Sequence, residues 1–268
     1  MRSGQSSVVT RAVNRVRHWS VRARDRVRSL PVRAAHRGQG PPIPPPHLMH
    51  LVAASEDVAW FLDGGQRGAS SLVSILEKNG IRLESLGSVL DFGCGVGRVL
   101  RHWAGLQGPT FHGTDYNPLL INWCQKNLPF AQCQLNELGG GLSYPDESFD
   151  LIYALSVFTH LDENLQGFWI KELSRTLRPG GYLFMTTHGE HYFGQLDDEE
   201  QDRYRGGELV VVGSRREGSN DCAAFHPESY VRSTLAREHG LEVIDFVPEG
   251  ALGNPRQDVF LLKKPNRA

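Results

Sequence analysis

The feature that most constrains the fold of this chain is a glycine-rich turn that follows a short apolar strand. The segment reads Val89-Leu-Asp-Phe-Gly-Cys-Gly-Val-Gly-Arg98. Glycine permits a tight turn and lets the backbone approach a ligand closely. One acid, Asp91, stands just before the glycines, and a second, Asp115, ends the next predicted strand. At about 20 residues past the turn, a carboxylate can accept hydrogen bonds from ribose hydroxyls. The segment therefore predicts a nucleoside-binding site.

Strand and helix patterns alternate on both sides of this turn. Such alternation over about 100 residues predicts an α/β fold with a doubly wound, mostly parallel sheet. Ligands of these sheets lie outside the carboxyl ends of the strands. The predicted strands are 88–91, 111–115, 149–155, 182–187, 241–247 and 259–262, and the predicted helices are 47–79, 98–104, 118–127, 165–177 and 227–239.

Charge and composition divide the chain into two parts. Residues 1–46 carry ten Arg and one acid, a net charge of +9 in a chain whose total is −1. Apolar residues in 9–30 recur at helical spacing, so we expect a basic amphipathic helix that ends at Pro31, followed by a proline-rich linker. Residues 47–268 form the main domain, with a polar insertion at about 189–226. Contact of the tail with an anionic membrane or an acidic partner competes with a solvated tail that binds nothing.

Composition also excludes several classes of protein. The near-neutral total and the acidic main domain disfavour nucleic acid as a partner, although the arginines keep that alternative open. The four cysteines show no zinc-ligand spacing, and His, Asp and Glu show no metal-ligand spacing, so we expect no metal. The chain contains no apolar run of bilayer length and no continuous apolar leader. We therefore expect a cytoplasmic protein, with peripheral membrane contact through the tail as the alternative.

The spacing of the glycines indicates which nucleoside is bound. A dinucleotide fingerprint reads GxGxxG and leaves a helix N-terminus open to pyrophosphate, whereas here the third glycine comes one residue early. An acid directly ahead of the turn disfavours phosphate and favours a cationic group. A nucleoside joined to an amino acid and lacking phosphate suits both carboxylates, and S-adenosylmethionine (SAM) has that structure.

With these motifs the chain resembles the class I SAM-dependent methyltransferases. The resemblance covers roughly residues 85–188 and includes 142–153 and 177–183, which are similar to the segments entering the family's fourth and fifth strands. It implies a seven-stranded sheet, SAM as the cofactor and an enzyme. Asn136 stands where many members carry an Asp near the adenine, and its amide can still bond the adenine amino group. The implied cofactor-binding residues are Asp91, Phe92, Gly93, Cys94, Gly95, Gly97, Asp115, Tyr116, Asn136, Glu137 and Leu155.

The residues that bind the methyl acceptor are predicted to follow the fourth and fifth strands and to lie in the insertion. A hydroxyl acceptor benefits from a base, whereas an amine only needs to arrive neutral. His188 is the first candidate base because it ends a strand, His160 is the second, and His226 follows. The alternative for each of them is a structural histidine or a helix cap. The loop 249–258 shapes the acceptor pocket or forms a tight hairpin. A similar bacterial subgroup is associated with glycan modification, so a sugar, a glycan or a small metabolite is the expected acceptor.

Two other functions remain open at this point. The first is a non-catalytic module that keeps the nucleoside pocket or docks a partner. The second is a nicotinamide-dependent oxidoreductase on a similar sheet.

Overall fold

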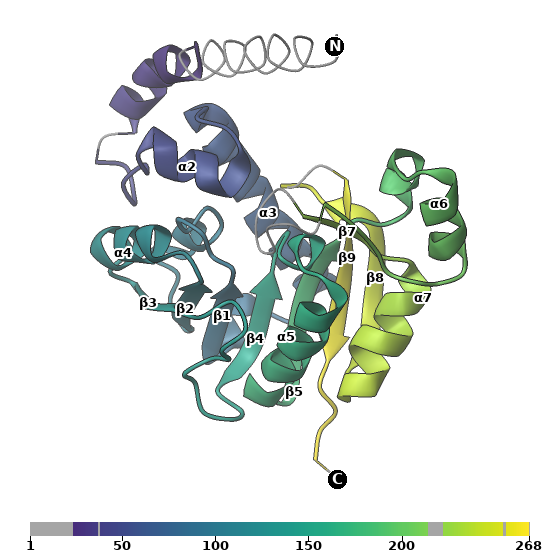
Figure 1. Cartoon of the computed structure of the whole chain (residues 1–268). Coiled ribbons are helices and arrows are strands. Elements are labelled where there is room, and N and C mark those ends of the chain that lie inside the picture. Colours follow the sequence, from purple (N-terminus) through teal and green to yellow (C-terminus); the bar gives the residue numbers. More distant parts are fainter. Residues whose placement is uncertain (1–23, 37, 214–221, 254–255, 268) are drawn as a thin grey trace, which may run out of the picture. The chain divides into compact units, whose positions relative to one another are not determined.

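A computed structural model describes residues 24–36, 38–213, 222–253 and 256–267 (Figure 1). Its contacts divide the chain into two units, one ending at Asp63 and the other beginning at Gly64. The division falls inside helix α3 (Val58–Lys78).

The first unit contains a helix at 24–35 and helix α2 (Pro46–Ala53). The predicted helix end at Pro31 is wrong, because the helix continues through this proline to residue 35. Proline costs a helix one backbone hydrogen bond. Contacts on both sides offset that loss: Ser29 Oγ donates to the Asp25 carbonyl, and the Arg33 guanidinium donates to the Pro44 carbonyl at 2.8 Å. Residues 1–23 lie outside the described residues, so the predicted helix there stays a prediction.

A seven-stranded sheet forms the centre of the second unit, in the order β3-β2-β1-β4-β5-β9-β8. The first five strands in this order pair in parallel, and β9 and β8 pair antiparallel with their neighbours. This order confirms the predicted doubly wound, mostly parallel sheet. The strands are β1 (Ser88–Phe92), β2 (Thr110–Asp115), β3 (Ala131–Leu135), β4 (Phe149–Ala154), β5 (Leu177–Thr187), β8 (Glu242–Ala251) and β9 (Gln257–Lys263).

Helices cover both faces of this sheet (Figure 1). One face packs against α5 (Glu163–Thr176) and the helical run at 228–239, through Trp169, Leu173 and Leu235. The other packs against the second half of α3 and against α4 (Pro118–Asn127), through Leu72, Leu76 and other apolar residues. Because both faces are buried, the central strands are apolar on both sides, as the continuous apolar run at 149–155 predicts.

Three predicted helices differ in the structure. The helix expected at 47–79 is interrupted at 54–57, where Ala54 adopts a φ of +50° after α2. The helix expected at 98–104 is only a short 3₁₀ helix, η2 (Leu100–Trp103), which is bracketed by Gly97 and Gly105, both at positive φ. The helix expected at 227–239 is a run of three types: α7 (Glu228–Tyr230), the π-helical η5 (Val231–Ala236) and the 3₁₀ helix η6 (Arg237–His239). Two further 3₁₀ helices are η1 (Leu83–Ser85) and η3 (Phe158–His160).

The segment after β5 forms a small subregion of its own. It contains η4 (Glu190–Gln195), α6 (Asp198–Arg205) and a two-stranded antiparallel ribbon of β6 (Val210–Val212) and β7 (Ala223–Phe225). A capping box between Asp197 and Glu200 starts α6. A bridge between His188 and Phe225 ties the ribbon to the end of β5. Whether this segment is an insertion relative to similar proteins stays a prediction.

Candidate functional site

The glycine-rich turn lies directly after β1 and is held against β2. Gly93, Gly95 and Gly97 all adopt positive φ angles, +74°, +56° and +69°. The amides of Gly93 and Cys94 both donate to the Thr114 carbonyl, at 2.8 and 2.9 Å. Residues with a side chain are strained at these φ angles, so the backbone conformation itself requires glycine.

Neighbouring side chains leave no room for larger residues in this turn. A Cβ atom on Gly93 would lie 2.5 Å from Val157 Cγ2, and one on Gly97 would lie 2.4 Å from Leu128 Cδ1. Helix α3 approaches from the other side, where a Cβ on Gly65 would lie 2.2 Å from the Arg98 carbonyl oxygen. Sequence reasoning missed this contact, although the glycines at 64, 65 and 68 inside a predicted helix were a visible signal.

Asp115 ends β2 beside the turn. Its Oδ2 accepts from the Gly95 amide at 2.9 Å, and its Oδ1 accepts from the Asn117 amide at 2.8 Å. Burial raises the pKa of this carboxyl, and the two amides oppose that shift. Each oxygen keeps a further lone pair, so the carboxylate can still accept from ribose hydroxyls. Tyr116 and Leu135 beside it are 40% and 51% exposed, which leaves apolar surface for a base.

Asp91 is more enclosed than the sequence suggested. It is 5% exposed and bonded to the Tyr153 hydroxyl, which accepts from Trp103 Nε1 at 2.9 Å. Burial raises the pKa of Asp91 well above its usual range, and the Tyr153 hydrogen bond and the charge of Arg98 act against that shift. The charge of Asp115 also reaches Asp91, so the structure brings both predicted acids to the same end of the sheet.

Asn136 follows β3 and lies next to Asp115. Its amide donates to the Asp115 carbonyl at 3.1 Å, and its Nδ2 donates to the Glu137 carbonyl at 3.0 Å. Its Oδ1 is buried and has no hydrogen-bond partner. A buried acceptor without a donor is costly, and an adenine amino group would supply that donor. This orphaned oxygen is the observation on which the site fits the nucleoside of SAM.

The remaining predicted cofactor residues occupy several places. The Phe92 side chain packs against Trp169 in the core, so only its backbone is available to a ligand. Cys94 is a free, buried thiol next to Cys124 and Cys133. Glu137 is exposed, and Leu155 is half-buried beyond the end of β4, close to Gly68.

A second polar group lies above β4, β5 and β9, and we call it the 257 network: Ser156, Thr186, His188 and Gln257. The Ser156 amide donates to Thr186 Oγ1 at 2.7 Å, and that hydroxyl donates to Gln257 Oε1 at 2.7 Å. Gln257 Nε2 then donates to Ser156 Oγ at 2.8 Å and lies 3.3 Å from His188 Nε2. Ser156 adopts a φ of +59°, so the network holds a strained backbone. The sequence did not single out Gln257 or Thr186, since neither follows a recognised spacing.

Hydrogen bonds fix the protonation of the histidines in this region. His188 accepts from Gln257 at Nε2, so its proton lies on Nδ1, which is buried without a partner. His160 Nδ1 donates to the Cys222 carbonyl at 2.8 Å, which leaves Nε2 as the acceptor atom. No described residue occupies that Nε2. His226 is 1% exposed, with Nε2 3.2 Å from Gln166 Oε1.

Burial keeps these three imidazoles neutral. It lowers the pKa of His160, it lowers that of His188 to about 4 with the help of His160, and it lowers that of His226 to about 3. The rings of His160 and His188 lie 6.4 Å apart, centre to centre.

The 257 network is continuous with the glycine turn. Val157 packs directly on Gly93, and its neighbour Ser156 bonds Gln257. The loop between β8 and β9 is a hairpin, as one of the two predictions for residues 249–258 states; Asn254 and Pro255 lie outside the described residues. No group of His, Cys, Asp or Glu in the described ranges is arranged to hold a metal ion. Within the same ranges no helix has the length and apolarity to cross a bilayer.

Comparison with known proteins agrees with this geometry. A family model described as a methyltransferase domain matches residues 90–185. A sterol 24-C-methyltransferase of Gibberella zeae is 30% identical over 155 residues, 53% of this chain and 39% of that protein. A fatty-acid O-methyltransferase of Mycolicibacterium smegmatis is 33% identical over 110 residues, 39% of this chain and 38% of that protein. The chain therefore spans less than half the length of these relatives.

Solved structures with the same fold are also SAM-dependent methyltransferases. One from Methanosarcina mazei has a TM-score of 0.54 and 22% identity, and the match covers 71% of this chain and 98% of that one. Another, from Clostridium acetobutylicum, has a TM-score of 0.54 and 14% identity, and the match covers 75% and 92%. These structures show that the fold is that of SAM-dependent methyltransferases, and the family model places a methyltransferase domain at residues 90–185. The glycine turn, Asp115 and the orphaned oxygen of Asn136 suit SAM as the cofactor of this domain.

Proposed function

We propose that this chain transfers the methyl group of SAM to an oxygen or nitrogen atom of a sugar, a glycan or a small polar metabolite, with a hydroxyl oxygen favoured. One observation supports the hydroxyl above the others. The Cys222 carbonyl fixes the His160 imidazole with its proton on Nδ1 and its Nε2 lone pair unused by any described residue.

A hydroxyl needs such a base more than an amine does. Its pKa is high, so a group that removes the proton during methyl transfer speeds the reaction, by about 10² to 10⁴-fold in typical enzymes. Because burial lowers the pKa of His160, the imidazole is neutral at pH 7 and able to accept a proton. SAM itself supplies the reactive carbon.

His188, the first candidate base in the sequence, has a different environment. Its Nε2 already accepts a long 3.3 Å hydrogen bond from Gln257, and this bond would have to open before Nε2 could take a proton. We therefore assign His160 as the base and propose that His188 and Gln257 position the acceptor hydroxyl.

The polarity around these histidines favours a polar acceptor. Ser156, Thr159 and Gln257 carry hydroxyl and amide groups that bond one another, and Gln257 Nε2 lies 3.3 Å from His188 Nε2. Two of the relatives are named for sterol and fatty-acid acceptors, and such an apolar molecule would leave Nε2 of His160 without a donor.

The experiment is mass spectrometry of reactions that contain isotopically labelled SAM and pooled glycan or metabolite extracts. We expect a product one labelled methyl group heavier than its acceptor. In His160→Asn, the amide can still donate to the Cys222 carbonyl but has no Nε2, so turnover should fall by about 10² or more with unchanged SAM affinity. His188→Asn should mainly raise KM.

Two results would contradict the proposal. Wild-type turnover in His160→Asn would remove this residue from the reaction. Calorimetric binding of S-adenosylhomocysteine without turnover on any acceptor would favour the non-catalytic module instead.

For the arginine-rich tail, we propose contact with an anionic membrane surface. On the helix at 24–35, Val27 and Leu30 are 67% and 64% exposed among arginines. Exposed apolar groups between cations suit an anionic lipid surface. Sedimentation with phosphatidylserine vesicles at low salt tests this: the full chain should sediment and a chain lacking residues 1–36 should not, whereas equal sedimentation would contradict it.

A further inference from the structure

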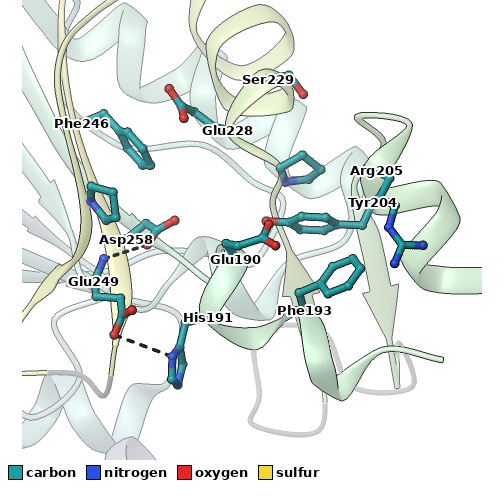
Figure 2. Close-up of a pocket in the computed structure, with 12 residues that line it drawn as sticks. Glu190, His191, Phe193, Tyr204, Arg205, Glu228, Ser229, Phe246, Glu249 and Asp258 are labelled. Atoms are coloured by element: carbon teal, nitrogen blue, oxygen red, sulfur yellow. Dashed lines mark hydrogen bonds and ion pairs between the residues drawn. The ribbon is translucent and has the colours of Figure 1, made fainter. Parts of the chain in front are cut away.

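A cavity of about 1000 Å³ lies between the edge strand β8 with its neighbour β9 on one side and η4, α6 and the start of α7 on the other (Figure 2). Four carboxylates line it: Glu190, Glu228, Glu249 and Asp258. The apolar part of its wall includes Pro227, Phe246 and Pro248. This volume is at the upper end of the range for small-molecule sites. We call it the edge cavity.

The edge cavity and the 257 network use opposite faces of β9. In the β5–β9 pair, Asp258 stands opposite Thr187, and consecutive residues of a strand point to opposite faces. Gln257 points to the face that carries the 257 network, so Asp258 points to the other face. Sites on two faces of one sheet can bind different molecules. Ligand binding in the edge cavity therefore does not depend on the proposed methyl transfer.

Pairing of charges leaves two of the four carboxylates uncompensated. Glu228 accepts from Arg232 at 2.6 Å, and Glu249 is paired with Arg256 at 3.2 Å. The lining residue Arg205 is itself paired with Asp202 at 2.9 Å. Within the described ranges, Glu190 and Asp258 have no cationic partner. The edge cavity therefore keeps about two unbalanced negative charges.

Asp258 is the more informative of these two acids. It is only 6% exposed, and its single hydrogen bond is the one that Oδ1 accepts from the Glu249 amide at 2.8 Å. Its Oδ2 has no donor among the described residues. Burial raises its pKa, and so do the charges of Glu249, Glu228 and Glu190. A buried carboxylate facing other carboxylates is costly unless a cation joins it.

Figure 2 shows how the two acids lie. Asp258 and Glu190 occupy the middle of the view, between Phe246 and Glu249 on one side and Phe193 and Tyr204 on the other. After burial, the charges of Glu190 and Asp258 raise the pKa of the Tyr204 hydroxyl, so both carboxylates lie on the same side of the cavity as this ring. An ammonium group between the two acids would donate to them while its carbon skeleton contacts the apolar wall.

A metal ion does not suit this arrangement. The described side chains contain no group of three or more ligands spaced to hold one. The combination of two free carboxylates with aromatic and proline walls instead suits an amphipathic organic cation.

We propose that the edge cavity is a second ligand site, which binds a small organic molecule carrying a primary ammonium group, held by Glu190 and Asp258. The carboxylates accept the N–H groups, and Phe246 with the two prolines contacts the hydrocarbon part.

The test is calorimetric titration of the full chain with phenethylamine and with 2-phenylethanol, a matched neutral probe. We expect the amine to bind at least about tenfold more tightly, since hydrogen bonds to charged groups carry most of the recognition. The double variant Glu190→Gln, Asp258→Asn should lose this preference, and the amide oxygen that it places at position 258 can still accept from the Glu249 amide. Glu199→Gln, an exposed acid outside the cavity, should behave as wild type.

Saturation with S-adenosylhomocysteine should not displace the amine, because the two sites lie on different faces. Three outcomes would overturn the proposal: no binding of phenethylamine at millimolar concentration to folded protein, equal affinity for the alcohol, or an unchanged preference in the double variant. Binding of Ca²⁺ in place of the amine would also overturn it.

Discussion

The two halves of the sheet are built in different ways. In the half formed by β1, β2 and β3, the glycine turn, Asp115 and Asn136 all follow strand ends within about fifty residues of sequence, and backbone amides hold them. In the half formed by β5, β9 and β8, the polar groups come from residues 156–160, 186–188, 222–226 and 256–258. Side chains from distant parts of the chain hold those groups.

This difference explains why the sequence predicts the site in the first half of the sheet and does not predict the polar groups in the second half. A ligand site made of backbone amides and glycines requires particular residues at particular spacings, so the sequence shows it. A site made of side chains can use many residue types at any spacing. If the two halves are built in this way, loss of a side chain in the first half should affect SAM affinity, and loss of one in the second half should affect stability and its pH dependence.

The largest expected effect is on Asp115 in the first half. Asp115→Asn places an amide N–H₂ against one of the two backbone amides that the carboxylate now accepts, and it weakens the bonds to ribose. At about 1.5 kcal/mol or more per charge-assisted bond, we expect SAM affinity to fall by about 100-fold in calorimetry.

The matched control is Asp162→Asn. Asp162 also accepts from a backbone amide, that of Leu165 at 2.8 Å, but it caps α5, where Asn serves as well as Asp. Its SAM affinity should stay at the wild-type value. Equal losses in both variants would mean that Asp115 acts through stability alone.

The next effect concerns the approach of α3 to the glycine turn. In Gly65→Ala the new methyl would lie 2.2 Å from the Arg98 carbonyl oxygen, so the backbone must move. We expect a loss of about 1–3 kcal/mol in the free energy of unfolding, measured with urea. In Gly167→Ala on α5, nothing lies within 4 Å of the new methyl, and unfolding should become more costly by up to about 1 kcal/mol. Changes of the same sign would contradict this packing.

A third effect is specific to the second half. Burial lowers the pKa of His226 to about 3, whereas an unfolded histidine titrates near pH 6.5. The unfolded chain therefore binds the proton first, and stability falls as the pH drops below about 6.5. The loss contributed by this residue approaches about 1.4 kcal/mol per pH unit until the folded pKa is reached.

His226→Asn removes that titration. Urea unfolding at several pH values should give a shallower decline between pH 6 and pH 4 than wild type, with parallel behaviour between pH 7 and pH 8. Identical slopes in the acid range would show that His226 is not buried as a neutral group.

The smallest effect is a helix cap in the first half. Asn117 Oδ1 accepts from the Leu119 amide at 3.0 Å and starts α4. Asn117→Ala should lower the free energy of unfolding by about 1 kcal/mol, and Asn117→Asp should leave it nearly unchanged. If Asn117→Ala lost more free energy of SAM binding than free energy of unfolding, the cap would also hold Asp115 in place.

The local sequence predicts most of the helices and strands, and it misses those that depend on contacts with distant residues. The glycine turn, the strand expected at 149–155 and the helix expected at 165–177 each have a local signal, and the structure has the strand at 149–154 and the helix at 163–176. The helix through Pro31 has no such signal, because contacts of Ser29 and Arg33 decide it.

For the histidines, the sequence did not show which ring nitrogen is open. It placed His188 first because a strand ends there, but the tautomer of a histidine depends on which ring nitrogen its neighbours bond. Gln257 and the Cys222 carbonyl, 69 and 62 residues away from the rings that they bond, decide this.

By itself, the sequence determined the doubly wound sheet, the SAM-type nucleoside site and the acids beside the glycine turn, because backbone geometry allows few residue types at those positions. The tertiary structure alone decided that Asp91 is enclosed by Tyr153, that His160 keeps a lone pair open, and that Glu190 and Asp258 share a cavity. Burial and hydrogen-bond partners set the chemistry of a polar side chain, and both depend on residues that only folding brings together.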